Sequence, residues 1–312
     1  MMVMTYRKSG NLFLPLLAIL IILATASPSL AASAKTSQKS FASPEEALNS
    51  LVVALKNRDK KNLLAILGPG AREIVSSGDP VADKAGRAQF VKLYEEKVVI
   101  EGADSGKAVF SLGNEDYPFP IPVVKKGNAW RFDAKAGKEE LLNRRIGRNE
   151  LNVIEVLQAY VDAQRDYAAK DRNGDGIWEF AQKIRSTPGK RDGLYWATRE
   201  DEEESPLGPF AAKAANEGYS KKNTAFHGYH YRVLKAQGPH AEGGAFNYVV
   251  NGRMMLGFGL VAYPAQYGAS GIMTFIVNQN GVVYQKNLGR NTATAAAKMT
   301  HYDPDKTWKK VE

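Results

Sequence analysis

The feature that most constrains the fold of this chain is a long helical pattern near its centre. From Lys138 to about Lys170, apolar residues recur on one helical face, while charged residues such as Asp162 can face outward. The apolar residues on this face and beside it are Val153, Ile154, Val156, Leu157, Tyr160, Val161, Tyr167 and Ala168. Gly147 is a candidate break between a helix that closes one domain and a longer helix that opens the next. Strand-like segments precede and follow this pattern, which predicts an α+β fold.

The residues before the long helix predict helices followed by strands. Ser43, Pro44 and Glu46 form a capping box that opens the first helix, and a second helix begins at Asp59. A third helix covers roughly residues 81–96. Four β-like segments cover residues 97–100, 107–112, 121–124 and 129–132. This order predicts a first domain in which helices pack on a curved antiparallel sheet.

The residues after the long helix are first polar and then rich in strand-like segments. The polar region 171–219 is long for a loop, so we expect a short helix near 209–217. The strand-like segments cover residues 229–236, 245–250, 256–263, 272–278 and 282–287. Asn280 and Gly281 predict a tight hairpin between the last two, because both central residues of such a turn need positive φ. The second domain is expected to be a long helix laid across an antiparallel sheet of four or five strands.

The N-terminal segment has the pattern of a secretory signal peptide. Arg7 and Lys8 precede an apolar, uncharged run over 12–26, and small residues follow it. This run is shorter than the roughly 20 residues needed to cross a bilayer, which favours cleavage near Ala31 or Ala34 over an uncleaved anchor. We therefore expect a periplasmic or secreted protein. Its predicted divisions are a signal peptide (1–34), a linker (35–42), an N-terminal domain (43–136), a C-terminal domain (137–302) and a tail (303–312).

Composition excludes several kinds of chemistry. The chain has no cysteine, which excludes disulfides, thiolate metal sites and cysteine nucleophiles. Its formal net charge is +9, but basic residues are scattered among acids and form no stripe of the kind that binds nucleic acid. No stretch after the signal peptide is apolar enough to span a membrane. The oligomeric state stays open.

Several blocks of residues, taken in order, resemble a known bacterial family. They cover residues 160–168, 171–176, 186–196, 205–209, 227–229, 250–254 and 263–268. Together they look like the family named domain of unknown function 2950, over essentially the whole mature chain. The resemblance implies an exported protein and supplies no activity.

Two weaker resemblances concern the shape of each half. The long helix, the segment 267–277 and the Gly-Val turn at 281–283 look like pilin-like modules of exported bacterial proteins. In true pilins the helix lies at the processed N-terminus, whereas here it is internal, so filament assembly is not implied. The order of helices and strands in the first half is similar to SnoaL-like cone folds, and such analogy carries little functional weight.

The sharpest local signal is the run of side-chain oxygens at Asp171, Asn173 and Asp175, with glycine at the sixth position. This spacing matches the first half of a Ca²⁺ loop, and Glu179 falls at the ninth position. The twelfth position is Gln182 instead of a bidentate glutamate, which implies weak affinity. The alternative is a turn in which these residues only satisfy backbone groups. Asp171, Asn173, Asp175 and Glu179 are therefore candidate calcium ligands.

Signals for catalysis or for other metals are weak. His227 and His230 fall at the start of a strand-like run, where they would point to opposite faces, which disfavours a zinc site. We find no convincing nucleophile motif of the Gly-x-Ser-x-Gly type. The favoured function is a non-enzymatic exported envelope protein, a binding or structural module that contacts an envelope protein or a cell-wall component. The alternative is a hydrolase of envelope polymers with carboxylate acid and base groups near the loop 192–196.

Overall fold

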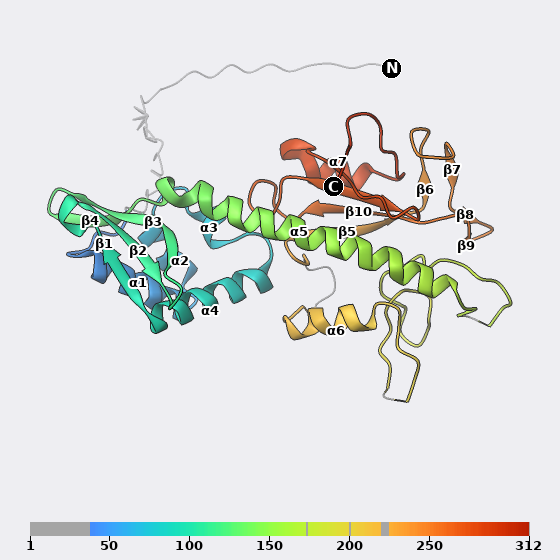
Figure 1. The fold of residues 1–312 in the computed structure, drawn as a ribbon, viewed down its shortest axis with the longest axis horizontal. Helices are drawn as coiled ribbons and strands as arrows, with labels where there is room; N and C mark the ends of the chain where they lie inside the picture. Colours follow the sequence, from blue (N-terminus) through green and yellow to red (C-terminus); the bar gives the residue numbers. More distant parts are fainter. Residues whose placement is uncertain (1–37, 173, 200, 220–224, 312) are drawn as a thin grey trace, which may run out of the picture. The chain divides into compact units, whose positions relative to one another are not determined.

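The computed structural model describes residues 38–172, 174–199, 201–219 and 225–311. These residues form helices and antiparallel sheets (Figure 1), which confirms the predicted α+β class. The predicted signal peptide and the first residues of the predicted linker lie outside the described residues.

The first half of the described chain places four helices beside a four-stranded antiparallel sheet. The helices are α1 (Pro44–Lys56), α2 (Lys60–Leu67), α3 (Arg72–Val75) and α4 (Pro80–Glu96). The strands are β1 (Val98–Glu101), β2 (Lys107–Leu112), β3 (Tyr117–Lys126) and β4 (Ala129–Phe132), in that order across the sheet, with the short 3₁₀ helix η1 (Ala103–Ser105) before β2. The predicted caps form, because Ser43 Oγ accepts a hydrogen bond from Glu46 N at 3.2 Å and Asp59 Oδ1 accepts one from Asn62 N at 2.9 Å.

A single apolar core joins these helices to this sheet. Leu48 and Ile66 come from α1 and α2, and they pack with strand residues that include Phe110 and Ile121. All four are almost fully buried. Burial of such side chains contributes roughly 1.5–3 kcal/mol each, which is the main stabilising contribution in this half.

The long helix α5 (Ala134–Ala168) is continuous, so the candidate break at Gly147 does not occur. An ideal Cβ built on Gly147 would meet nothing within 4 Å, so this glycine is not required by close packing. A glycine inside a helix costs about 1 kcal/mol relative to alanine. The buried residues Leu142, Ile146 and Val153 on both sides of it more than offset that cost.

The second half contains a five-stranded antiparallel sheet with the order β13-β12-β11-β10-β5. Its strands are β5 (Tyr229–Leu234), β10 (Gly259–Pro264), β11 (Thr274–Asn278), β12 (Tyr284–Lys286) and β13 (Lys309–Lys310). The short pairs β6 (Ala236–Gln237) with β7 (Phe246–Asn247) and β8 (Val249–Val250) with β9 (Arg253–Met254) lie outside it. The remaining helices are α6 (Gly208–Asn216), η2 (Gly289–Asn291) and α7 (Thr292–Lys298).

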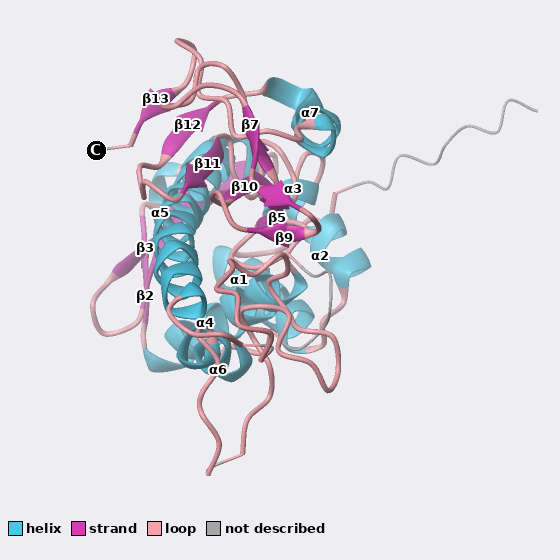
Figure 2. Cartoon of the chain, turned by 90° about the vertical axis from the view of Figure 1, so that its right-hand side faces the viewer, coloured by secondary structure: helices cyan, strands magenta, loops and turns pink. Residues whose placement is uncertain are grey.

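Both faces of the five-stranded sheet are covered, which explains the nearly unbroken apolar sequence of β10 and β11. Leu260 and Phe275 pack with Leu157 of α5 on one face. Val261 and Ile276 belong to a separate cluster on the other face, where α7 contacts β10. Figure 2 shows α5 on one side of these strands and α7 on the other. Side chains alternate between the faces of a strand, so two covered faces require apolar residues at every position.

The prediction of a tight turn with two positive φ values at Asn280 and Gly281 is wrong. Gly281 has a φ of +74°, but Asn280 is not among the described residues with positive φ. Gly281 N instead donates to Asn278 O at 2.9 Å, within a longer connection between β11 and β12. The turn with two positive φ values lies at Asn251 (+51°) and Gly252 (+80°), directly between β8 and β9.

Candidate binding site

A groove of about 770 Å³ lies in the second half of the chain, where α5, α6, β5 and β10 meet two loops. Its lining residues are Val156, Tyr160, Lys183, Ile184, Arg185, Tyr195, Leu207, Phe210, Ala211, Ala214, Tyr219, Phe226, His230, Tyr231, Leu260 and Tyr263. Aromatic rings dominate this set, and it contains no aspartate or glutamate. Pockets of roughly 300–1,000 Å³, mostly apolar and with a few polar groups, are the usual form of ligand sites. We call this feature the aromatic groove.

Residues of the hydrophobic core form one part of the aromatic groove. Tyr160 of α5 is almost fully buried, and its hydroxyl donates to Gly259 O at 3.3 Å. Gln164, one helical turn further along α5, donates to the Tyr160 hydroxyl at 2.9 Å. Leu260 of β10 lies in the same core cluster. Because these groups belong to the core, this part of the groove is formed without a ligand.

Aromatic rings in edge contact form another part of the aromatic groove. The Phe226 ring lies 5.6 Å from the Phe210 ring of α6 and 4.8 Å from the Tyr219 ring, both in edge-on geometry. On neighbouring strands, His230 and Tyr263 have ring centroids 5.6 Å apart. Edge-on pairs add about 0.5–1.5 kcal/mol beyond the area that they bury. The contacts of Phe226 link α6 to the segment before β5.

Two cationic side chains lie among the groove's lining residues. Arg185 places its guanidinium 4.9 Å from the centre of the Tyr195 ring, in a cation–π contact. Lys183 Nζ donates to Asp192 Oδ2 at 2.6 Å and to Thr187 Oγ1 at 2.8 Å. No ion pair within 4.0 Å is found for Arg185 among the described residues. Its charge therefore remains available to a ligand.

Burial shifts His230 and Tyr231 of the aromatic groove toward their neutral forms. Burial lowers the pKa of His230 below its ordinary value, although the charge of Asp79 opposes this shift. Burial also raises the pKa of Tyr231 far above its ordinary value, so the hydroxyl keeps its proton. At neutral pH the groove therefore offers flat apolar faces, neutral hydroxyls and positive charge. This combination suits a neutral or anionic ligand with apolar faces.

Asp192 begins the loop 192–196, near which a hydrolase would place its carboxylates. The Asp192 carboxylate accepts several hydrogen bonds from neighbouring residues. Thr187 donates to it through the backbone N at 2.7 Å and through the hydroxyl at 2.9 Å, in addition to the contact with Lys183. Desolvation raises the pKa of Asp192, but these hydrogen bonds outweigh it and bring the pKa to about 2. A general acid must hold a proton near the working pH, and this carboxyl does not.

The candidate calcium ligands lie at the end of α5. Asp171 accepts hydrogen bonds from its own loop, from Gly174 N at 2.8 Å and Gly176 N at 2.7 Å. Asp175 Oδ2 lies 2.6 Å from Arg253 Nη1, and Glu179 Oε1 lies 4.0 Å from the same nitrogen. Asn173 lies outside the described residues. Asp175 and Glu179 thus both lie near the guanidinium of Arg253. A cation that binds this loop would be repelled by that guanidinium unless it displaced it.

The two histidines considered for zinc contact different partners. His227 Nε2 lies 3.5 Å from Glu217 Oε2, and its Nδ1 lies 3.3 Å from Asn152 Nδ2. His230 instead packs against Tyr263 in the aromatic groove. Within the described ranges, no three His, Cys, Asp or Glu side chains are grouped as a metal site requires.

Comparison with known families places the chain in one of them. Residues 38–311 match the family described as "Protein of unknown function (DUF2950)". Because this match covers most of the sequence, the chain belongs to that family. No curated protein and no solved structure matches the chain, so the resemblances to pilin-like and SnoaL-like folds stay predictions. Among the described helices, none has the length and apolar character needed to cross a bilayer.

The aromatic groove was not predicted from the sequence. The sequence patterns place Val156 and Tyr160 on the long helix and raise His230 only as a disfavoured zinc ligand. The available signal was the density of aromatic residues between Tyr195 and Tyr231 in an otherwise polar region. Their convergence depends on contacts between distant segments, which one sequence does not reveal.

Proposed function

We propose that this chain is a non-enzymatic exported protein of the bacterial cell envelope, and that it binds a cell-wall glycan fragment in the aromatic groove. The signal-peptide pattern of the first 34 residues supports export. The single observation that carries the proposed activity is the lining of the groove, which combines aromatic rings with the exposed cation Arg185 and, among the described residues, holds no aspartate or glutamate.

The groove's chemistry favours this ligand class in two ways. Tyrosine offers a broad apolar face and a hydroxyl at one end, which suits sugar rings that have apolar faces and polar edges. Arg185 suits the carboxylates of the peptide stems that cell-wall glycans carry, whereas Lys183 is already paired with Asp192. A cationic ligand is disfavoured, because Arg185 would repel it and no acid among the described lining residues would pair with it.

The same features argue against the alternative of a hydrolase. Glycoside hydrolysis generally uses a pair of carboxylates beside the scissile bond, and one of them must keep its proton. No carboxylate of the described residues lines the groove, and the neighbouring Asp192 has a pKa of about 2 in its contact with Lys183 and Thr187. We therefore assign the groove to binding.

Co-sedimentation of the mature protein with insoluble peptidoglycan tests this proposal. Arg185→Gln removes an exposed charge from the groove, and Phe210→Ala removes one aromatic ring. Trp178→Ala is the matched control, because Trp178 is 68% exposed and is not among the lining residues. We expect each groove variant to bind about tenfold more weakly and the control to bind as the wild type does. Absence of wild-type binding, or an equal loss in all three variants, would contradict the proposal.

We also propose that the loop with Asp171, Asn173, Asp175 and Glu179 takes Ca²⁺ with low affinity. The alternating oxygens and the positive φ of Gly176 (+81°) support this proposal. Arg253 beside Asp175 and Glu179 opposes it, because a guanidinium repels a divalent cation. Binding of Ca²⁺ would stabilise the end of α5.

A further inference from the structure

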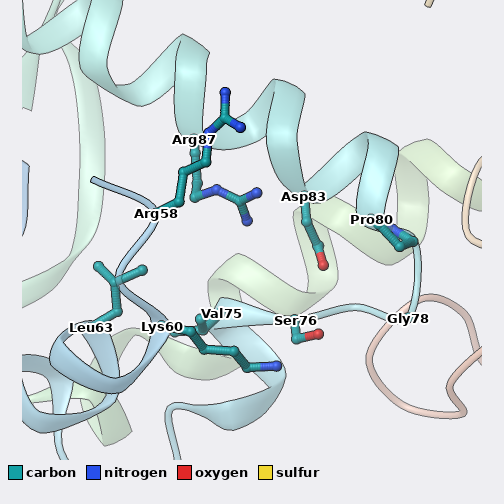
Figure 3. A pocket seen from close by; sticks show the side chains of 9 residues that line it. All are labelled: Arg58, Lys60, Leu63, Val75, Ser76, Gly78, Pro80, Asp83 and Arg87. Carbon is teal, nitrogen blue, oxygen red and sulfur yellow. The ribbon is translucent and has the colours of Figure 1, made fainter. Parts of the chain in front are cut away.

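A second cavity, of about 270 Å³, lies in the first half of the chain, between the start of α2, the loop after α3 and the helix α4. Its lining residues are Arg58, Lys60, Leu63, Val75, Ser76, Gly78, Pro80, Asp83 and Arg87 (Figure 3). None of them lines the aromatic groove, so an inference about this cavity does not depend on the function proposed above. We call it the basic pocket.

Positive charge dominates the basic pocket. Arg58, Lys60 and Arg87 contribute three cations, and in Figure 3 the two arginines lie on one side of the pocket and Lys60 on the other. Asp83 is the only acid in the lining, and its carboxylate already accepts hydrogen bonds from Ser77, from the backbone N at 3.1 Å and from the hydroxyl at 2.7 Å. No salt bridge within 4.0 Å pairs any of the three cations with an acid in the part of the chain that the structure describes.

The backbone at Arg58 gives an independent indication that its side chain has a role. Arg58 follows Asn57, the C-cap of α1, and its φ is +55°. Glycine is the usual residue at this position of a helix end, because a side chain is strained when φ is positive. Strained residues of this kind gather at binding sites. An arginine here places a charge in the pocket at the expense of local stability.

The donors of the basic pocket match a tetrahedral oxyanion. Each guanidinium can direct two parallel N–H groups at a phosphate, while the ammonium of Lys60 acts as a mobile point charge. The hydroxyl of Ser76 is a further donor in the lining. The apolar side chains of Leu63 and Val75 lower the local dielectric on one side, which strengthens these charge-assisted contacts.

We propose that the basic pocket binds a phosphate group. A phosphate offers more acceptor oxygens and more negative charge than a carboxylate, so it can pair with more of the three cations that line the pocket. The ligand is either a free phosphate compound or the phosphate of a lipid headgroup, since the chemistry of recognition is the same for both.

Titration of the mature protein with inorganic phosphate, at ionic strength held constant with chloride, tests this site. Arg58→Gly removes the cation and restores the residue that the backbone prefers, so the variant should melt no lower than the wild type. Arg87→Gln is the second variant, and Lys84→Gln is the matched control, because Lys84 is an exposed cation of α4 that does not line the pocket. We expect saturable binding that weakens about tenfold in both pocket variants and is unchanged in the control. Absence of saturable binding, or equal weakening in Lys84→Gln, would overturn the proposal.

A second measurement distinguishes the two sources of phosphate. The protein is sedimented with vesicles of pure phosphatidylcholine and with vesicles that also contain phosphatidylglycerol. Capture by the anionic vesicles that phosphate competes away, and that Arg58→Gly and Arg87→Gln abolish, supports a lipid headgroup as the ligand. Saturable phosphate binding without capture supports a free phosphate compound. If Lys84→Gln reduces capture as much as Arg58→Gly and Arg87→Gln do, capture reflects net charge alone, and this result would count against the pocket.

Discussion

The carboxylate of Asp79 accepts a hydrogen bond of 2.8 Å from the hydroxyl of Tyr219, a residue 140 positions further along the chain. Asp79 is fully buried, and the same oxygen accepts a second hydrogen bond from Gly228 N at 2.8 Å. Its other oxygen caps α4 by accepting from Val81 N at 3.0 Å. One side chain therefore links the start of α4, in the first half, to a residue of the aromatic groove and to the turn before β5. Burial and the Asp79 charge raise the pKa of Tyr219 far above its ordinary value.

We predict that Asp79→Ala destabilises the protein by at least about 3 kcal/mol, because several buried donors lose their acceptor at once. Tyr219→Phe removes one of these hydrogen bonds and keeps the ring contacts, so its cost should be only about 1.5–3 kcal/mol. Urea denaturation measures both free energies of unfolding. An Asp79→Ala variant no less stable than Tyr219→Phe would show that Asp79 does not link the two halves.

Two glycines of α5 should respond oppositely to alanine. A Cβ on Gly137 would lie 2.4 Å from Pro120 O, so Gly137→Ala forces α5 away from β3 and should cost about 1–3 kcal/mol. A Cβ on Gly147 would meet nothing within 4 Å, so Gly147→Ala should stabilise the protein by about 0.5–1 kcal/mol. Thermal unfolding of both variants provides the comparison. A stabilising Gly137→Ala would contradict the close packing of α5 on β3.

The Asp192 carboxylate should make the free energy of unfolding depend on pH in the acid range. Its pKa is about 2 in the folded protein, against about 3.9 in an unfolded chain. A lowered folded pKa contributes stability that is present above the unfolded pKa and is lost as the pH falls through the folded pKa. The difference in unfolding free energy between wild type and Asp192→Asn should therefore shrink as the pH falls from about 5 to about 2. A difference that stays constant over this range would contradict the ion pair with Lys183.

Calcium binding should be weak in the wild type and stronger when Arg253 loses its charge. Arg253→Gln removes the guanidinium that lies 2.6 Å from Asp175 and 4.0 Å from Glu179. Calorimetric titration up to about 1 mM free Ca²⁺ should detect saturable binding, tighter in Arg253→Gln and lost in Asp175→Asn. If Asp175→Asn leaves the heat of titration unchanged, or if no heat is detected in any variant, the calcium proposal is wrong.

Local patterns predicted those parts of the fold that depend on neighbouring residues. Residue spacing alone predicted the capping residue Ser43, the apolar face of α5 and the strand 107–112. The hairpin prediction failed because an Asn-Gly dipeptide forms a tight hairpin only where paired strands adjoin it. At Asn251 the paired strands adjoin the dipeptide, whereas at Asn280 residues 279–283 all separate β11 from β12.

The binding surfaces could not be predicted in the same way. The aromatic groove gathers residues from Val156 to Tyr263, and no local spacing relates Phe210 on α6 to Tyr231 on β5. The basic pocket likewise joins Arg58, at the end of α1, to Arg87 on α4. Both surfaces arise only when the helices pack, so their residues are scattered along the sequence.

The most direct test of the central claim is calorimetric titration of the mature protein with a soluble disaccharide–peptide fragment of peptidoglycan, with chromatography of the fragment afterwards. We predict saturable binding of one fragment per chain, weakened by Phe210→Ala and Arg185→Gln, and an intact fragment at the end. Absence of binding, binding that neither substitution changes, or cleavage of the fragment would contradict the account of the aromatic groove as a non-catalytic glycan site.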